Sequence, residues 1–264
     1  MKSYDFEYDG LNLSDKGFII CKFSYDGLET ISNGSQITFN TVSTLRGAKH
    51  ELTGAEYGEC LSSSFQICKH PCKASDTEIS IDEMRDVMRW LNRKKFHKFK
   101  LLNDDYINIF FEASFNVSKI EFEGKIIGFE LEMITNRPYA LHEPIPVVIK
   151  NTQNNGEFNI YSQSDDEGYI YPEMEIIINS NGNFEMYNAF ENRMMRIANC
   201  VSGEVIKISY PMIESSVASH KIQNDFNWHF FRIAKSFKNS LNKTQISIPC
   251  VVKMTYSPIV KVGI

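Results

Sequence analysis

The sequence predicts a mainly β protein built from antiparallel sheets. In several segments hydrophobic residues alternate with polar ones, and this period of two places one face of a strand in a core and the other in water. Pairs such as Glu123-Gly124 and Asn181-Gly182, which favour tight reversals, separate these segments. The chain has 264 residues, 42% of them hydrophobic. It is therefore long enough to bury one large core or two smaller ones.

The clearest predicted strand covers residues 107–117, in which one face carries Ile107, Ile109, Phe111, Ala113, Phe115 and Val117. A second alternating run, residues 127–133, follows the Glu123-Gly124 turn. We therefore expect these two strands to pair as neighbours. Residues 4–8 and 246–256 alternate in the same way near the two ends of the chain.

One helix is predicted near residues 80–93. Ser80 and Glu83 have the spacing of a capping box, in which the serine oxygen and the glutamate side chain satisfy amides at the start of the helix. After this start, an apolar stripe with helical spacing is formed by Ile81, Met84, Met88 and Leu91.

Two features of this helix are candidates for an interface. Arg85, Arg89 and Arg93 lie along a face beside the apolar stripe, where they form either a solvated surface or a contact with protein or nucleic acid. Trp90 projects away from the stripe, so we expect it to pack on another element of the fold or on another chain.

The chain is predicted to contain two domains. Three prolines fall within nine positions at Pro138, Pro144 and Pro146, directly after a long predicted strand. We place the boundary there, between an N-terminal domain of residues 1–140 and a C-terminal domain of residues 141–264. The last residues, 253–264, either complete the second domain or return to the first.

Composition excludes several classes of protein. The net charge is −5, so nucleic acid is not an expected ligand. The sequence has no run of about eighteen apolar residues, which argues against a membrane-spanning helix. Its first ten residues are acidic rather than basic, which argues against a secretory signal. We accordingly expect the six cysteines to be reduced thiols that mostly fill the core.

No pattern for catalysis or for a cofactor stands out. The glycine-rich phosphate-binding motifs are missing, and so are H-E-x-x-H and G-x-S-x-G. The nearest approach to a metal cluster is Cys60, Cys68, His70 and Cys72. On a strand, His70 would face away from Cys68 and Cys72, so structural cysteines are favoured over zinc. We therefore predict no catalytic residue, no cofactor, no metal and no enzymatic activity.

Short motifs then follow one another in a specific order along most of the chain. They are Tyr4–Gly10 leading to Gly17–Ile20, Trp90-Leu91, Leu101–Tyr106, Pro138–Ala140, Ser202–Glu204, Asp225–Trp228 and Asn242. In this order they resemble the distal tail proteins of long-tailed bacteriophages. Residues 24–75 and 147–168 match that pattern poorly. A phage, a prophage or a tail-like bacteriocin is an equally suitable source.

The resemblance implies a structural protein. Its N-terminal β-sandwich, with the helix, would assemble into a hexameric ring, and its C-terminal domain would be a galectin-like or carbohydrate-module-like β-sandwich. The ring would be a hub in the virion tail tip, made and assembled in the host bacterial cytoplasm. It would join the tail tube protein to the tail-tip protein that carries fibres or lytic domains, around a channel through which DNA passes.

Within such a ring, Trp90, Arg85, Arg89 and Arg93 are our predicted interface residues. An alternative function is a carbohydrate-binding module of a receptor-recognition device, in which Trp228 stacks on a sugar. A sandwich-fold hydrolase is a third possibility, but it requires facing carboxylates or a nucleophile that the sequence does not reveal.

Overall fold

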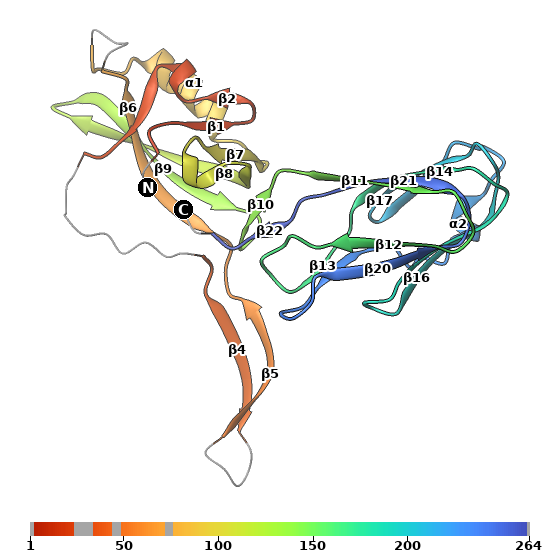
Figure 1. Ribbon diagram of the computed structural model, residues 1–264. Coiled ribbons are helices and arrows are strands. Elements are labelled where there is room, and N and C mark those ends of the chain that lie inside the picture. The colour runs from red at the N-terminus through yellow and green to blue at the C-terminus, as the bar shows by residue number, and fades with distance from the viewer. Residues whose placement is uncertain (1–2, 24–33, 44–48, 72–75, 263–264) are drawn as a thin grey trace. The chain divides into compact units, whose positions relative to one another are not determined.

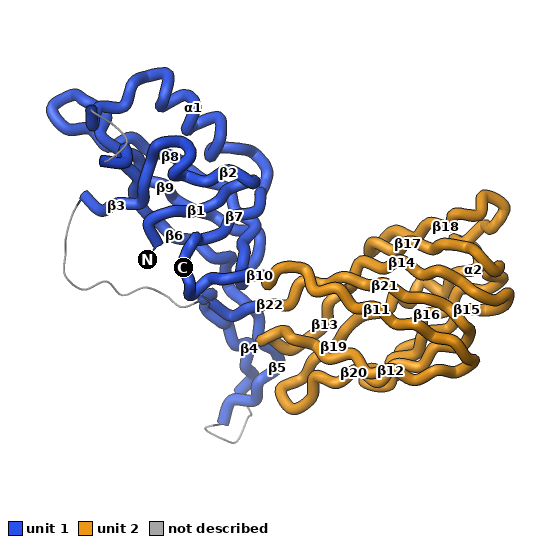
Figure 2. Tube along the Cα trace, turned by 45° about the horizontal axis from the view of Figure 1, so that its top comes forward, with its two compact units in different colours: residues 1–141, 260–264 blue, residues 142–259 orange. Residues whose placement is uncertain are grey.

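The computed structural model describes residues 3–23, 34–43, 49–71 and 76–262. The chain forms two compact units, which Figure 2 shows in two colours. Unit 1 contains residues 1–141 and 260–264, and unit 2 contains residues 142–259. The chain is mainly β, which confirms the predicted fold class. The predicted division into domains 1–140 and 141–264 stays a prediction.

Unit 1 is built on one sheet of nine strands in the order β2-β1-β7-β8-β9-β6-β3, with β10 beside β8 and β22 beside β10 (Figure 1). The strands are β1 (Phe6–Tyr8), β2 (Leu11–Asn12), β3 (Phe18–Cys21), β6 (Ser62–Lys69), β7 (His97–Leu101), β8 (Ile109–Phe122), β9 (Lys125–Thr135), β10 (Ala140–His142) and β22 (Ile259–Val260). Short 3-10 turns cover Ser14–Lys16 and Asp104–Tyr106.

The two central strands confirm the sequence pattern. β9 contains the run predicted at residues 127–133, and β8 contains residues 109–117 of the run predicted at 107–117, whose first member Ile107 is 63% exposed and lies before the strand. The two strands pair antiparallel up to the Phe122–Lys125 pair. Between them Glu123 and Gly124 have φ angles of 50° and 77°. Positive φ at both central positions is the geometry of a two-residue hairpin turn, and glycine adopts it without strain.

Helix α1 (Ile81–Leu91) begins with the predicted capping box: the Ser80 side chain accepts from the Glu83 amide, and the Glu83 carboxylate accepts from the Ser80 amide. The predicted apolar stripe is wrong at its first member, because Ile81 is 69% exposed. The prediction holds for Leu91, which is buried, while Met84 and Met88 are half-buried. Val87 and Trp90, which lie outside the predicted stripe, are also buried.

Strands β4 (Ile37–Ser43) and β5 (His50–Tyr57) pair only with each other. All seven residues of β4 and six of the eight residues of β5 are exposed, so most of both faces of this hairpin is uncovered. Its exposed apolar side chains include Phe39, Val42 and Leu52, at 62%, 57% and 59%. This segment lacks the core contacts that stabilise the other strands. An isolated two-stranded hairpin is only marginally stable in water.

Unit 2 is a sandwich of two antiparallel sheets with a large apolar core. One sheet has the order β11-β21-β14-β17-β18, formed by Ile145–Asn151, Cys250–Tyr256, Glu173–Ile178, Val205–Ser209 and Met212–Ser215. The other has the order β12-β20-β15-β16, formed by Gly156–Tyr161, Leu241–Ile246, Gly182–Asn188 and Arg193–Cys200. A small pair, β13 (Gly168–Ile170) with β19 (Ile233–Lys235), and helix α2 (Ile222–Asp225) complete the unit.

Within the described residues, no helix has both the length and the apolar character that crossing a membrane requires.

Candidate functional site

The predicted basic patch on α1 is partly neutralised by acids of its own unit. Arg85 and Arg89 remain exposed, but Asp82 and Asp86, each three residues earlier in the helix, lie 3.7 Å and 2.8 Å from their guanidinium nitrogens. Arg93 is more strongly held: its Nη1 lies 2.8 Å from Oδ2 of Asp9. These contacts leave little unpaired positive charge for nucleic acid. A role of the three arginines in a protein interface stays a prediction.

The Arg93 side chain also covers an aromatic ring. Its guanidinium carbon lies 5.0 Å from the centre of the Tyr8 ring, within the range of a cation–π contact. Burial raises the pKa of the Tyr8 hydroxyl, and Arg93 opposes this shift only in part, so Tyr8 stays neutral. Arg93 therefore closes the end of the unit 1 core as well as pairing with Asp9.

Trp90 belongs to that core. Its side chain is 7% exposed, and its Nε1 donates a hydrogen bond to the Tyr8 carbonyl over 3.1 Å. Its ring stacks on Phe6 with 5.6 Å between centroids and an interplanar angle of 14°. Of the two possibilities that the sequence left open, the structure shows packing on another element of the fold. The burial of Trp90 does not support the interface role predicted for it.

Trp228, in unit 2, is held at the surface. It is 52% exposed and has a φ angle of 59°, which is unusual for a bulky residue. The neighbouring Asn227 side chain fixes the turn by accepting hydrogen bonds from the amides of Arg196 and His229 and donating one to the Met194 carbonyl. Stacking of Trp228 on a sugar stays a prediction.

The possible metal cluster is only partly described, because Cys72 lies outside the described residues. Among the rest of the described chain, no group of three His, Cys, Asp or Glu side chains has the arrangement of a metal site. Cys68 lies instead beside Cys21 of β3, where burial and the neighbouring thiol raise the pKa of Cys21. The contact with Cys21 agrees with a structural role for Cys68. The absence of a metal at this cluster stays a prediction.

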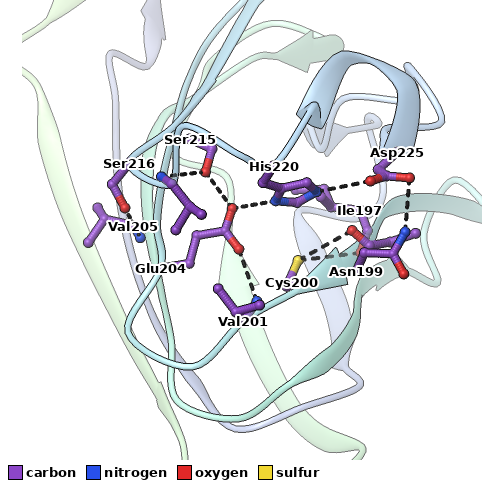
Figure 3. Close-up of polar contacts among 12 residues, drawn as sticks. Ile197, Asn199, Cys200, Val201, Glu204, Val205, Ser215, Ser216, His220 and Asp225 are labelled. Carbon is purple, nitrogen blue, oxygen red and sulfur yellow. Dashed lines mark hydrogen bonds and ion pairs between the residues drawn. The ribbon is translucent and has the colours of Figure 1, made fainter.

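Unit 2 contains a buried charged network that the sequence did not reveal (Figure 3). Glu204 has no exposed surface, yet its carboxylate accepts hydrogen bonds from the Ser215 hydroxyl over 2.5 Å and from the Val201 amide over 3.0 Å. Nδ1 of His220 lies 2.6 Å from the same carboxylate, and Nε2 lies 3.2 Å from Oδ2 of Asp225. The second contact has the distance of an ion pair without the angles of a hydrogen bond.

These contacts hold the carboxylate in its charged form. Desolvation by burial raises the pKa of Glu204, but the hydrogen bonds from Ser215 and the Val201 amide, together with His220, outweigh it, so the net pKa is lowered. Asp225 in turn accepts a hydrogen bond from Asn199 over 3.1 Å. The network therefore ties α2 to β16 and β18 inside the sandwich.

The network does not have the arrangement of a nucleophilic site. In a serine or cysteine hydrolase, one imidazole nitrogen faces the nucleophile. Here both nitrogens of His220 face carboxylates, and the Ser215 hydroxyl donates to Glu204. The imidazole side chain is also only 5% exposed, so a substrate cannot reach it. The contacts among Glu204, Ser215, His220 and Asp225 therefore have a structural role, and together they form the Glu204 clamp.

The two units, each closed around its own core, define a protein of two β domains. Residues 1–137 match a family model described as phage tail protein N-terminal domain, and residues 139–256 match one described as phage tail C-terminal domain. The chain belongs to this family of phage tail proteins. No curated protein matches the sequence significantly.

Among solved structures, the chain is similar to the Dit protein (gp 19.1) of SPP1, described as a paradigm of the hub adsorption apparatus in phages that infect Gram-positive bacteria. The TM-score is 0.66 at 9% sequence identity, over 97% of this chain and 99% of that one. At this identity the likeness shows the fold, which extends through both units. The resemblance to distal tail proteins stated from the sequence is confirmed.

The position of Trp90 predicts a cost to folding. We expect Trp90→Ala to lower the free energy of unfolding of unit 1 by about 3–5 kcal/mol, because it leaves a cavity beside Phe6 and removes the hydrogen bond to Tyr8. Urea unfolding followed by circular dichroism measures this change. Trp228→Ala, the same substitution at a half-exposed position, is the matched control and should cost much less. If Trp90→Ala leaves the free energy of unfolding unchanged but prevents assembly, Trp90 is an interface residue after all.

The Glu204 clamp predicts a pH dependence. Because its pKa is lower in the folded than in the unfolded state, the carboxylate stabilises unit 2 above its ordinary pKa of 4.5, and this contribution disappears as the pH falls through the folded value. We expect Glu204→Gln to lower the free energy of unfolding by about 3 kcal/mol at neutral pH, since it leaves His220 without its buried partner. The difference in the free energy of unfolding between this variant and the wild type should be smaller at acidic pH, where Glu204 becomes protonated in the wild type.

Urea titrations at pH 7 and pH 3 compare the two proteins. Glu175→Gln, which removes an ion pair with Lys253 on the outer surface, is the control and should change little. If the free energies of unfolding of the wild type and of Glu204→Gln differ by the same amount at both pH values, the negative charge of Glu204 does not contribute to the stability of unit 2.

Proposed function

We propose that this chain is a distal tail protein whose copies form a hexameric ring at the tail tip. The ring is a hub that joins the tail tube protein to the tail-tip protein and leaves a channel for DNA. The observation that carries the proposal is the similarity of fold to a hub protein over nearly the whole of both chains. Agreement of both halves with phage tail domain models supports the same assignment.

The uncovered hairpin supports assembly. Strands β4 and β5 expose apolar side chains on a ribbon that is only marginally stable by itself. Head-to-tail contact between identical chains covers such a segment in every copy, and six copies related by rotation close the ring. A stable contact of this kind buries about 800 Å² on each partner.

The charge balance fits a channel that does not retain DNA. Positively charged linings bind DNA by releasing its counterions, whereas the chain has a net charge of −5. Arg85 and Arg89 of α1, and Arg93 just after it, pair with aspartates and therefore add little free positive charge. No catalytic step belongs to this function. The ring acts by holding its neighbours in position as part of the host adsorption apparatus.

Assembly is tested with the purified chain. Light scattering coupled to size exclusion should show a ring, and the double variant Phe39→Ser/Leu52→Ser should shift the population to monomer, because it removes exposed apolar contacts of the hairpin. The variant should keep its circular dichroism spectrum and unfolding midpoint, since both side chains are exposed.

Phe237→Ser serves as the control, because Phe237 is 87% exposed and belongs to unit 2 rather than to the hairpin. The control should assemble like the wild type. A wild-type chain that stays monomeric at high concentration, both alone and with the tail tube protein, would contradict the proposed ring. Unchanged ring formation by the double variant would show that the hairpin is not the contact.

A further inference from the structure

Two cysteines lie on the outer face of the unit 1 sheet, on neighbouring strands. In β3, Phe18 packs in the core, so Cys21, three residues later, faces outward. In β6, Ile67 is fully buried in the core, so the next residue, Cys68, faces outward as well. Both thiols are free and only partly buried. The two side chains therefore share one face of the sheet.

The register of the two strands makes these cysteines diagonal neighbours. Cys21 lies opposite Gln66, and Cys68 lies opposite Ile19. The Cys21 thiol is hydrogen-bonded to Cys68 across this diagonal. The two sulfur atoms are therefore in contact before any bond joins them.

The chain that follows β3 holds Cys21 in this position. The Phe23 amide donates a hydrogen bond to Oε1 of Gln66 over 2.9 Å. The Phe23 ring lies against Gly128 of β9, the residue that pairs with Cys68. A Cβ atom at Gly128 would lie 2.6 Å from this ring, so only glycine leaves room for it. These contacts keep the end of β3 against β6.

The position of Cys21 also gives it the freedom that a disulfide requires. The Cα atoms of two bonded cysteines are usually about 5.5–6 Å apart, whereas diagonal neighbours in an antiparallel pair are about 7–8 Å apart. β3 is the last strand in the order of the sheet, and Cys21 is its last residue. Such a strand end can move toward β6 by the required distance of about 1–2 Å without displacing another strand.

We propose that Cys21 and Cys68 form a reversible disulfide, so that unit 1 has a dithiol form and a crosslinked form. The oxidant is a small-molecule disulfide. The thiolate of one cysteine attacks a sulfur of this oxidant and releases a small thiol, and the second cysteine then displaces the other small thiol from the mixed disulfide. In total the two cysteines lose two protons and two electrons, and the oxidant gains both and becomes two thiols.

The surroundings of the pair make this reaction slow at neutral pH. Burial and the neighbouring thiol raise the pKa of Cys21, and the thiolate is the reactive form. Thiols stay reduced in a bacterial cytoplasm, whereas disulfides persist on virion surfaces. The crosslinked form therefore belongs to the released particle. This timing rests on the proposed function, but the chemistry of the pair does not.

The disulfide would join the two strands that precede and follow the uncovered hairpin. It closes a loop of residues 22–67, which contains both β4 and β5. A crosslink restricts the unfolded chain, and this stabilising effect grows with the size of the loop. Oxidation would therefore stabilise the part of unit 1 that carries the hairpin, without adding a contact to the hairpin itself.

The test uses the full chain, incubated at mildly alkaline pH with oxidised glutathione or with dithiothreitol. Free thiols are then alkylated in denaturant, and an unreduced digest is analysed by mass spectrometry. We expect the oxidised sample to contain a peptide pair that joins Cys21 to Cys68 and lacks both thiol hydrogens. The midpoint of thermal unfolding should rise by about 5–10 °C on oxidation and return when dithiothreitol is added.

Single variants separate this bond from other effects of the oxidant. In Cys21→Ser and Cys68→Ser, the midpoint should not depend on oxidation. Cys60→Ser, which removes an exposed cysteine outside the pair, is the matched control and should respond like the wild type. The peptide map of the wild type decides the question even where a variant does not fold.

Three results would overturn the proposal. They are Cys21 and Cys68 that both remain open to alkylation after oxidation, glutathione that stays attached to either of them, and a bond from either of them to another cysteine. An unfolding midpoint that falls on oxidation would overturn the stabilising role of the bond. Ring formation is scored separately by light scattering, so the failure of this proposal is distinguishable from the failure of the proposed hub.

Discussion

Both units depend on one constraint of β structure, namely that a strand can bury only every second side chain. In β14, Met174, Ile176 and Ile178 face the core, whereas Glu173 and Glu175 face outward. Each sheet therefore has one face whose composition is set by packing and another that is free to carry polar groups. Core and outer surface therefore come from the same short stretch of sequence.

The hairpin β4–β5 shows what happens where the constraint is not met. Most of both faces of its strands is uncovered, although they carry Phe39, Val42 and Leu52. Side chains of this kind normally supply stability by burial, about 25 cal/mol for each Å² of apolar surface removed from water. A chain that leaves them exposed has not completed its own burial, which is the physical basis for expecting a partner at this position.

The sequence predicted those parts of the fold that depend on local pattern. Alternation and the Glu123-Gly124 turn were enough for the β8–β9 pair, and the Ser80 and Glu83 spacing was enough for the start of α1. Which side of α1 is buried depends on the sheet that it meets, and a stripe of apolar residues does not contain that information. Ile81 was consequently placed in the core and Trp90 outside the stripe, although Trp90 packs on Phe6.

The candidate site was harder to predict because its members are distant in sequence. Glu204, His220 and Asp225 are ordinary polar residues until the fold brings them within 2.6 Å and 3.2 Å of one another. The only local signals were the Ser202–Glu204 and Asp225–Trp228 motifs, which marked positions without showing that Glu204 and Asp225 share one histidine.

The two units differ in how completely they bury their apolar side chains. Unit 2 closes its core between two sheets and pins α2 with a buried charge network, so its outer surface is free of structural demands. Unit 1 has an equally closed core, but it also carries the hairpin whose apolar side chains remain in water. The proposed contacts between copies therefore involve unit 1, which carries the uncovered hairpin.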